Sequence, residues 1–172
     1  MVDRATDEAT DEVDRIVAAW QRERPDLDVS PLEVLSRVSR LARYLDIARR
    51  HAFDRWDLVA WEFDVLSALR RSGEPYVLSA GELVRQTLVT SGTMTNRIDR
   101  LVSRGMVARA HSASDRRTVL ITLTVAGREA VDGALADLVE DERGLLASLS
   151  AQERSSLAGL LRDLVVRFER TD

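Results

Sequence analysis

Apolar residues recur at every third or fourth position along much of the chain, a spacing that predicts amphipathic helices. Three serines are each followed three residues later by glutamate, a pairing typical of helix starts: Ser30, Ser79 and Ser150. The pattern predicts a connection at residues 52–56, a short helix opening at Ser79, a last helix after Ser150, and longer helices over residues 7–22, 30–50, 57–71, 91–104 and 125–149. We therefore expect a mainly α-helical protein.

Two short segments depart from this spacing because their apolar and polar residues alternate, as in half-buried strands. They cover residues 106–109 and 118–123, and the polar loop HSASDRR between them is too long for a two-residue hairpin turn. A further short strand is expected at residues 76–78. Helix, turn, helix and hairpin in this order predict a winged helix-turn-helix with a small β wing.

The predicted helix over residues 91–104 has two chemically different faces. One face is apolar, and the other carries small polar groups and then arginines: Ser91, Thr93, Thr95, Asn96, Arg97 and Arg100. Such a face suits the major groove of DNA, where short polar side chains and arginine reach base edges. Arg116 and Arg117 in the loop suit a minor groove, whose negative potential favours guanidinium groups. The alternative for both groups of residues is ordinary solvated surface.

The net charge of −4 is unevenly distributed along the 172 residues. Residues 85–117 hold seven arginines and two acidic residues, whereas residues 1–33 hold ten acidic residues and four arginines. Positive charge is therefore concentrated on the segment expected to contact phosphates. The absence of cysteine excludes disulfides and thiolate metal sites, and no apolar run reaches membrane-spanning length. With an N-terminus too acidic for a signal peptide, these features favour a cytoplasmic protein without metal or cofactor.

The wing segment contains Asp115-x-Arg117 followed by Ile121-x-Leu123-Thr124, and RLVSRGMVAR stands at the end of the preceding helix. These segments resemble those of the MarR family of transcriptional regulators. The resemblance implies that Asp115 pairs with Arg117 to hold the wing, which leaves Arg116 for DNA. It also implies a homodimer on a pseudo-palindromic operator, with N-terminal dimerisation helices in residues 1–56, the DNA-binding lobe in residues 57–124 and C-terminal dimerisation helices in residues 125–172.

Four further residues resemble the urate-responsive branch of this family, the HucR and PecS type. They are Trp20 in an added N-terminal helix, Asp64 in the helix before the DNA motif, Arg97 in the recognition helix and Arg109 in the first wing strand. The resemblance implies a repressor that urate releases from DNA. Arginine presents a planar fork of donors to such an anion, and tryptophan supplies an N–H donor and an apolar face. Asp64 is expected to pair with an arginine when no ligand is bound.

Alternatives to urate and to a ligand-responsive regulator follow from the same residues. Two arginines do not identify their anion, so other carboxylates or phenolic acids stay open, as does a ligand-independent DNA-binding protein in which Asp64 is a static ion-pair partner. An enzyme is disfavoured, since the two histidines are far apart and no HExxH, P-loop or GxSxG motif occurs. We therefore assign no catalytic residue.

Overall fold

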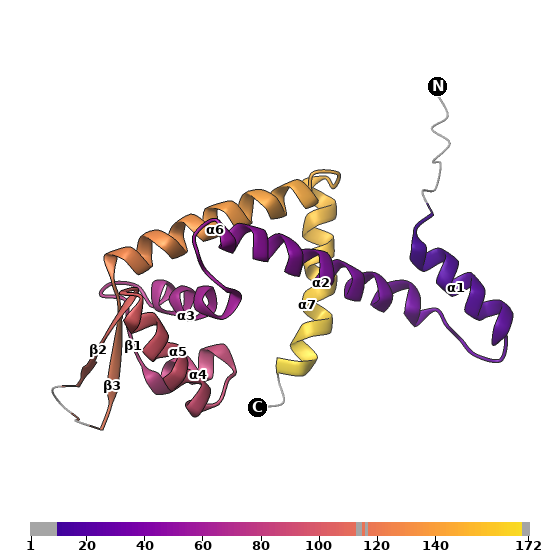
Figure 1. The fold of residues 1–172 in the computed structure, drawn as a ribbon. Helices are drawn as coiled ribbons and strands as arrows, with labels where there is room; N and C mark the ends of the chain where they lie inside the picture. The colour runs from indigo at the N-terminus through magenta and orange to yellow at the C-terminus, as the bar shows by residue number, and fades with distance from the viewer. Residues whose placement is uncertain (1–9, 113–114, 116, 170–172) are drawn as a thin grey trace. The chain divides into compact units, whose positions relative to one another are not determined.

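The computed structural model describes residues 10–112, 115 and 117–169, and the chain divides into two compact units, residues 1–47 and 48–172. The fold is mainly helical with a small antiparallel sheet, which confirms the predicted fold class. In chain order the elements are α1 (Glu12–Glu23), α2 (Pro31–Asp54), α3 (Ala60–Arg71), β1 (Val77–Ser79), α4 (Ala80–Thr87), α5 (Ser91–Ser103), β2 (Val107–His111), β3 (Val119–Leu123), α6 (Val125–Leu145) and α7 (Ala151–Glu169) (Figure 1).

The first unit is built from α1 and most of α2. Helix α1 begins at Glu12 with Asp11 as its N-cap, and residues 7–9, where the helix was expected to start, lie outside the described residues. The Asp11 carboxylate accepts hydrogen bonds from the backbone N–H of Val13 and Asp14, at 2.7 and 3.1 Å. Val13 and Val17 are buried together with Val29, so one apolar stripe of α1 forms the small core of this unit.

Helix α2 is longer than its pattern predicted. The connection expected at residues 52–56 is wrong in its first half, because α2 continues to Asp54. Ala52 and Phe53 are fully buried, and the Phe53 ring stacks on Phe63 of α3 with 4.2 Å between centroids. Burial in the core of the second unit therefore extends the helix beyond the point where its own pattern weakens.

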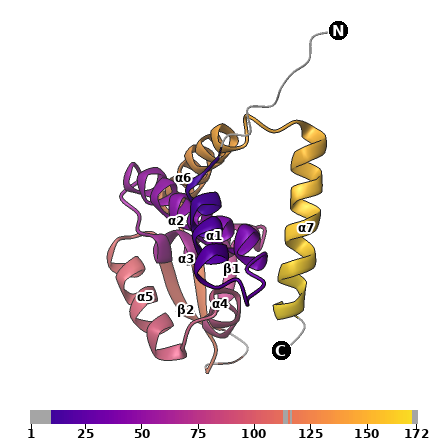
Figure 2. The same ribbon diagram turned by 90° about the vertical axis from the view of Figure 1, so that its right-hand side faces the viewer.

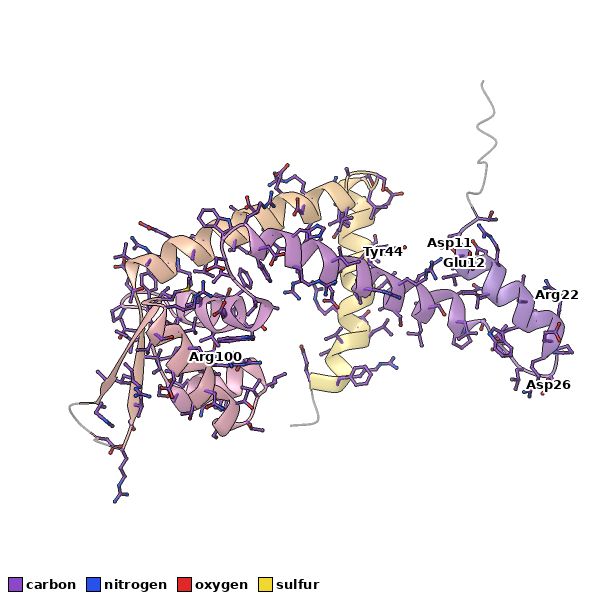
Figure 3. All side chains as sticks on the ribbon, viewed as in Figure 1. Asp11, Glu12, Arg22, Asp26, Tyr44 and Arg100 are labelled. Atoms are coloured by element: carbon purple, nitrogen blue, oxygen red, sulfur yellow. The ribbon has the colours of Figure 1, made fainter. Side chains whose placement is uncertain are left out.

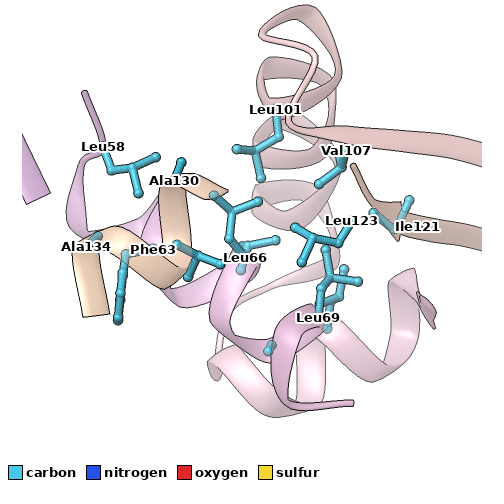
Figure 4. Close-up of a cluster of buried hydrophobic side chains, with 14 of the residues drawn as sticks. Leu58, Phe63, Leu66, Leu69, Leu101, Val107, Ile121, Leu123, Ala130 and Ala134 are labelled. Carbon is cyan, nitrogen blue, oxygen red and sulfur yellow. The ribbon is translucent and has the colours of Figure 1, made fainter. Parts of the chain in front are cut away.

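The second unit packs α3, α4, α5 and α6 around a sheet with strand order β1-β3-β2. The strands are antiparallel, with Leu78 opposite Ile121 and Val107 opposite Leu123. Their buried side chains meet leucines of α3 and α5 in one apolar core, and the alanines of α6 close it from another side (Figure 4). This core is the platform that holds α5 and the β2–β3 hairpin.

Two glycines of α6 allow close packing. A Cβ on Gly133 would lie 2.1 Å from Cζ2 of Trp56, and one on Gly127 would lie 2.1 Å from the carbonyl oxygen of Met106. Trp56 also donates a hydrogen bond from its indole N–H to Asp137, at 2.9 Å. These contacts fix α6 on the rest of the second unit.

Helix α7 has no buried residue. Both views show it leaving the end of α6 without packing on α3, α4 or α5 (Figures 1 and 2). It exposes a series of large apolar side chains: Leu157, Leu160, Leu161, Leu164, Val165 and Phe168. Among the described residues, no helix has the length and hydropathy that a membrane span requires.

Candidate nucleic-acid interface and effector site

Helix α5 is capped at both ends by groups that its sequence supplies. The Thr90 hydroxyl accepts the backbone N–H of Thr93 at 3.3 Å, and Gly105, with φ of +68°, follows the helix in the left-handed region. The predicted DNA-contacting side chains of this helix are all exposed: Ser91, Thr93, Thr95, Asn96 and Arg100. A short, firmly ended helix therefore presents a polar face to solvent.

The wing loop is organised by Asp115, but not through the predicted side-chain pair. Its carboxylate accepts the backbone N–H of Arg117 at 2.9 Å and the hydroxyl of Thr118 at 2.8 Å. The N–H of Arg117, and then the Thr118 hydroxyl, lower the pKa of Asp115 below its usual range. Asp115 thus holds the backbone of Arg117, and the Arg117 side chain is exposed. Arg116, assigned to DNA contact, lies outside the described residues.

The two arginines assigned to a ligand have different neighbours. The Arg97 guanidinium lies over the ring of Trp61 on α3, with 5.4 Å from its carbon to the ring centroid. Arg109 on β2 instead donates to Asp99 of α5, at 2.7 Å. Because Arg97 and Asp99 are two positions apart, they point in directions about 200° apart around the α5 axis. The two arginines therefore lie on different sides of the recognition helix.

The other two assigned ligand residues are both exposed, and one belongs to each unit. Asp64 is exposed on α3, about one helical turn after Trp61. Within the described ranges it has no hydrogen-bond or ion-pair partner, so the expected pair with an arginine is not formed there. Trp20 belongs to the first unit, on α1, where 49% of its surface is exposed.

Sequence reasoning missed an ion-pair network at the end of α5. Glu62 of α3 is only 4% exposed, and its carboxylate accepts from Arg104, the C-cap residue of α5, at 2.6 Å. Arg104 also pairs with Asp57 at 2.7 Å. Glu62, followed by Asp57, raises the pKa of Arg104. The available signal was a glutamate three residues after the N-cap Val59, at the start of an apolar helix.

Two hollows lie along α3 and α5, and they share Trp61 and Arg100. The smaller has a volume of about 240 Å³ and is lined by Trp61, Thr93, Asn96, Arg97 and Arg100. The larger, of about 440 Å³, has an acidic wall that includes Asp54, Asp57 and Glu62. Figure 3 shows Arg100 on the side of α5 that faces α3. Among the residues that the structure describes, no group of three or more histidine, aspartate or glutamate side chains is placed to hold a metal ion.

The chain is similar in sequence and in fold to DNA-binding regulators. A MarR family model matches residues 56–118. The HTH-type transcriptional regulator PecS of Dickeya dadantii is 40% identical over 132 residues, which cover 77% of this chain and 80% of PecS. A mutant of Escherichia coli MarR, solved in complex with operator DNA, is similar over 80% of this chain and 99% of its own, with 26% identity and a TM-score of 0.66.

A further relative connects this fold with a small ligand. BpsR of Bordetella bronchiseptica, whose DNA binding is regulated by 6-hydroxynicotinic acid, is 30% identical to this chain. The similarity covers 75% of this chain and 98% of BpsR, with a TM-score of 0.58.

Proposed function

The chain belongs to the MarR family of DNA-binding transcriptional regulators, and we propose that it is a homodimeric repressor released from its operator by a small planar anion. Urate is the first candidate. The observation that carries the proposal is that α5 has a half-buried arginine on one side and an arginine-bound aspartate on another. A ligand that engages either arginine acts directly on the DNA-reading helix.

Two groups of side chains support a division of labour on DNA. Thr95 and Asn96 lie on the exposed part of α5 and suit contacts with base edges. Arg100, Arg116 and Arg117 suit phosphates or a minor groove, where they add affinity on most sequences. The concentration of arginine in residues 85–117 supports the same interface, although the chain as a whole has a net negative charge.

The exposed apolar face of α7 supports the homodimer. A row of exposed leucines that no element among the described residues of its unit covers is the kind of surface that a subunit interface buries. A two-fold dimer presents two recognition helices, which suits half-sites about 10 base pairs apart, centre to centre.

The effector proposal is supported by the chemistry of the arginines and by the relatives. Arg97 and, once it leaves Asp99, Arg109 each offer a forked donor to a planar anion, and Trp20 supplies an N–H donor in the added helix. Asp64, exposed on α3 one helical turn from Trp61, is proposed to affect release from DNA rather than ligand affinity. The 6-hydroxynicotinic acid response of BpsR favours an aromatic carboxylate as the second candidate.

Calorimetry on the full chain tests the effector proposal. We expect urate to bind wild type and to bind Arg109→Ala more weakly, because one forked donor is lost. Trp20→Phe should also weaken binding, through the lost N–H donor, while it keeps an aromatic ring in place. Asp64→Asn should leave binding largely intact and reduce the effect of urate on DNA, because a charge is lost but the arginines stay. Equal affinity of wild type and Arg109→Ala would remove Arg109 from the site, and binding of 6-hydroxynicotinate alone would replace urate as the effector.

A further inference from the structure

The smaller hollow between α3 and α5 has a lining suited to one class of ligand. Its described lining residues comprise one aromatic ring, two polar side chains and two arginines, with no acidic group. Ligand pockets for drug-sized molecules span roughly 300–1,000 Å³, so a hollow of about 240 Å³ suits a smaller molecule. An aromatic wall facing two cations fits a small planar anion.

Arg97 is held in this hollow without being neutralised. Its guanidinium lies over the Trp61 ring, and within residues 10–112, 115 and 117–169 it has no hydrogen-bond or ion-pair partner. The side chain is half-buried, so its position is constrained. A ring face attracts the cation but accepts no conventional hydrogen bonds, which leaves the N–H donors free for a ligand.

The neighbouring arginines differ from Arg97 in this respect. Arg104 is occupied by Glu62 and Asp57, and Arg109 is occupied by Asp99. The larger hollow also places acidic side chains beside Arg104, and these would repel an anion. The smaller hollow is therefore where an anion meets the least opposing charge.

We propose that Arg97 and Arg100 form an anion subsite in this hollow, and that Trp61 is its positioning residue. The inference rests on the proposed function and names the place where the effector's anionic edge binds. Trp61 holds the Arg97 guanidinium in position before the ligand binds. The entropy cost of immobilising this side chain on binding is therefore smaller. Arg100 lines the same hollow and also belongs to the proposed DNA-contacting set. An anion bound in the subsite consequently neutralises the charge of Arg100, which is then no longer available to DNA.

Isothermal titration of the full chain with urate, and separately with 6-hydroxynicotinate, tests this subsite. The variants are Trp61→Leu, which removes the aromatic face, and Trp61→Phe, which keeps one. The loss of a cation–π contact predicts a roughly 3- to 30-fold weaker affinity for Trp61→Leu. Trp61→Phe should recover most of that loss, which a purely space-filling role would not predict.

Trp56→Leu is the matched control, because Trp56 lies in the same unit but lines neither hollow. Its affinity should equal that of wild type. If Trp61→Leu fails to fold, Arg100→Gln carries the test, since Arg100 is exposed and its loss should still weaken binding. Wild-type affinity in Trp61→Leu or in Arg100→Gln overturns the subsite and leaves the proposed function standing. Failure of wild type to bind either probe overturns both.

Discussion

Gly133 and Gly144 occupy the same helix, α6, but face different surroundings. A Cβ on Gly133 would overlap the Trp56 ring, whereas nothing lies within 4 Å of a Cβ on Gly144. The chain therefore uses one glycine for close approach, and the other contributes only backbone freedom.

Gly133→Ala is expected to lower the free energy of unfolding by about 1–3 kcal/mol, because the added methyl group must displace a packed indole. Gly144→Ala should instead raise it by up to about 1 kcal/mol, since alanine favours the helix. Urea denaturation of both variants, followed by circular dichroism, measures the two values. Equal effects at the two positions would rule out the packing of Trp56 on Gly133.

The two carboxylates of α3 differ in burial, which residue type alone does not predict. Asp64, the acidic residue of α3 that the resemblance assigns to the ligand site, is exposed. Glu62, two positions earlier, is the buried one and carries the ion pair with Arg104. Both acids interrupt the same apolar run, so only the direction of each side chain distinguishes them, and that direction depends on tertiary packing.

At the scale of elements, α5 is anchored by the cap at Thr90 and by the pair between its C-cap residue and α3. The second anchor joins α5, the proposed DNA-reading helix, to the core of its unit. Its loss should therefore affect stability and DNA binding together.

Glu62→Gln should cost about 1.5–3 kcal/mol of unfolding free energy, because a nearly buried charged hydrogen bond to Arg104 is lost. Glu140→Gln removes the exposed pair with Arg143 and should cost about 1 kcal/mol or less. Denaturant melts give the two values, and fluorescence anisotropy with labelled operator gives the effect on DNA. A stable Glu62→Gln variant with wild-type DNA binding would contradict this anchoring role.

In the first unit, Arg37 of α2 ties down α1 through Asp11 and Asp14, at 2.9 and 2.7 Å. Arg37→Gln is expected to raise the hydrogen–deuterium exchange of α1 amides at neutral pH. Arg40→Gln, on the same helix and without an ion pair among the described residues, should leave exchange unchanged.

The same contact has a defined pH dependence. Arg37 is the main cause of the lowered pKa of Asp11. A carboxyl whose pKa is lower in the folded protein stabilises the fold above its unfolded value and loses this contribution as pH falls through its folded value. We therefore expect α1 protection, corrected for intrinsic exchange rates, to persist at neutral pH and to fall below pH of about 3.8.

Helical spacing, capping serines and strand alternation predicted the order of the elements and the winged helix. The predictions failed where tertiary contacts decide, as at Phe53, whose burial prolongs α2. For the candidate site, the sequence identified Arg97 and Arg109 but not their partners. Trp61 and Asp99 come from packing between elements, which periodicity does not report.

At the scale of the whole molecule, the uncovered leucines of α7 lead to the proposed dimer. Leu164→Glu should weaken dimerisation and operator binding together, because a charge would enter the interface. Ser155→Glu is the control, since it lies nine positions earlier and about 180° around the same helix. Light scattering at micromolar concentration measures the mass of each variant. A monomeric wild type would contradict the dimer, and so would a dimeric Leu164→Glu with unchanged operator affinity.

The most direct test of the account is operator binding in the presence of urate. The operator is the duplex that the full-length protein selects from a random DNA pool, and its affinity is measured by fluorescence anisotropy as urate is added. The account predicts a graded loss of affinity of about 5- to 150-fold, the range of typical allosteric couplings. Unchanged operator affinity at a urate concentration that calorimetry shows to be saturating would contradict it.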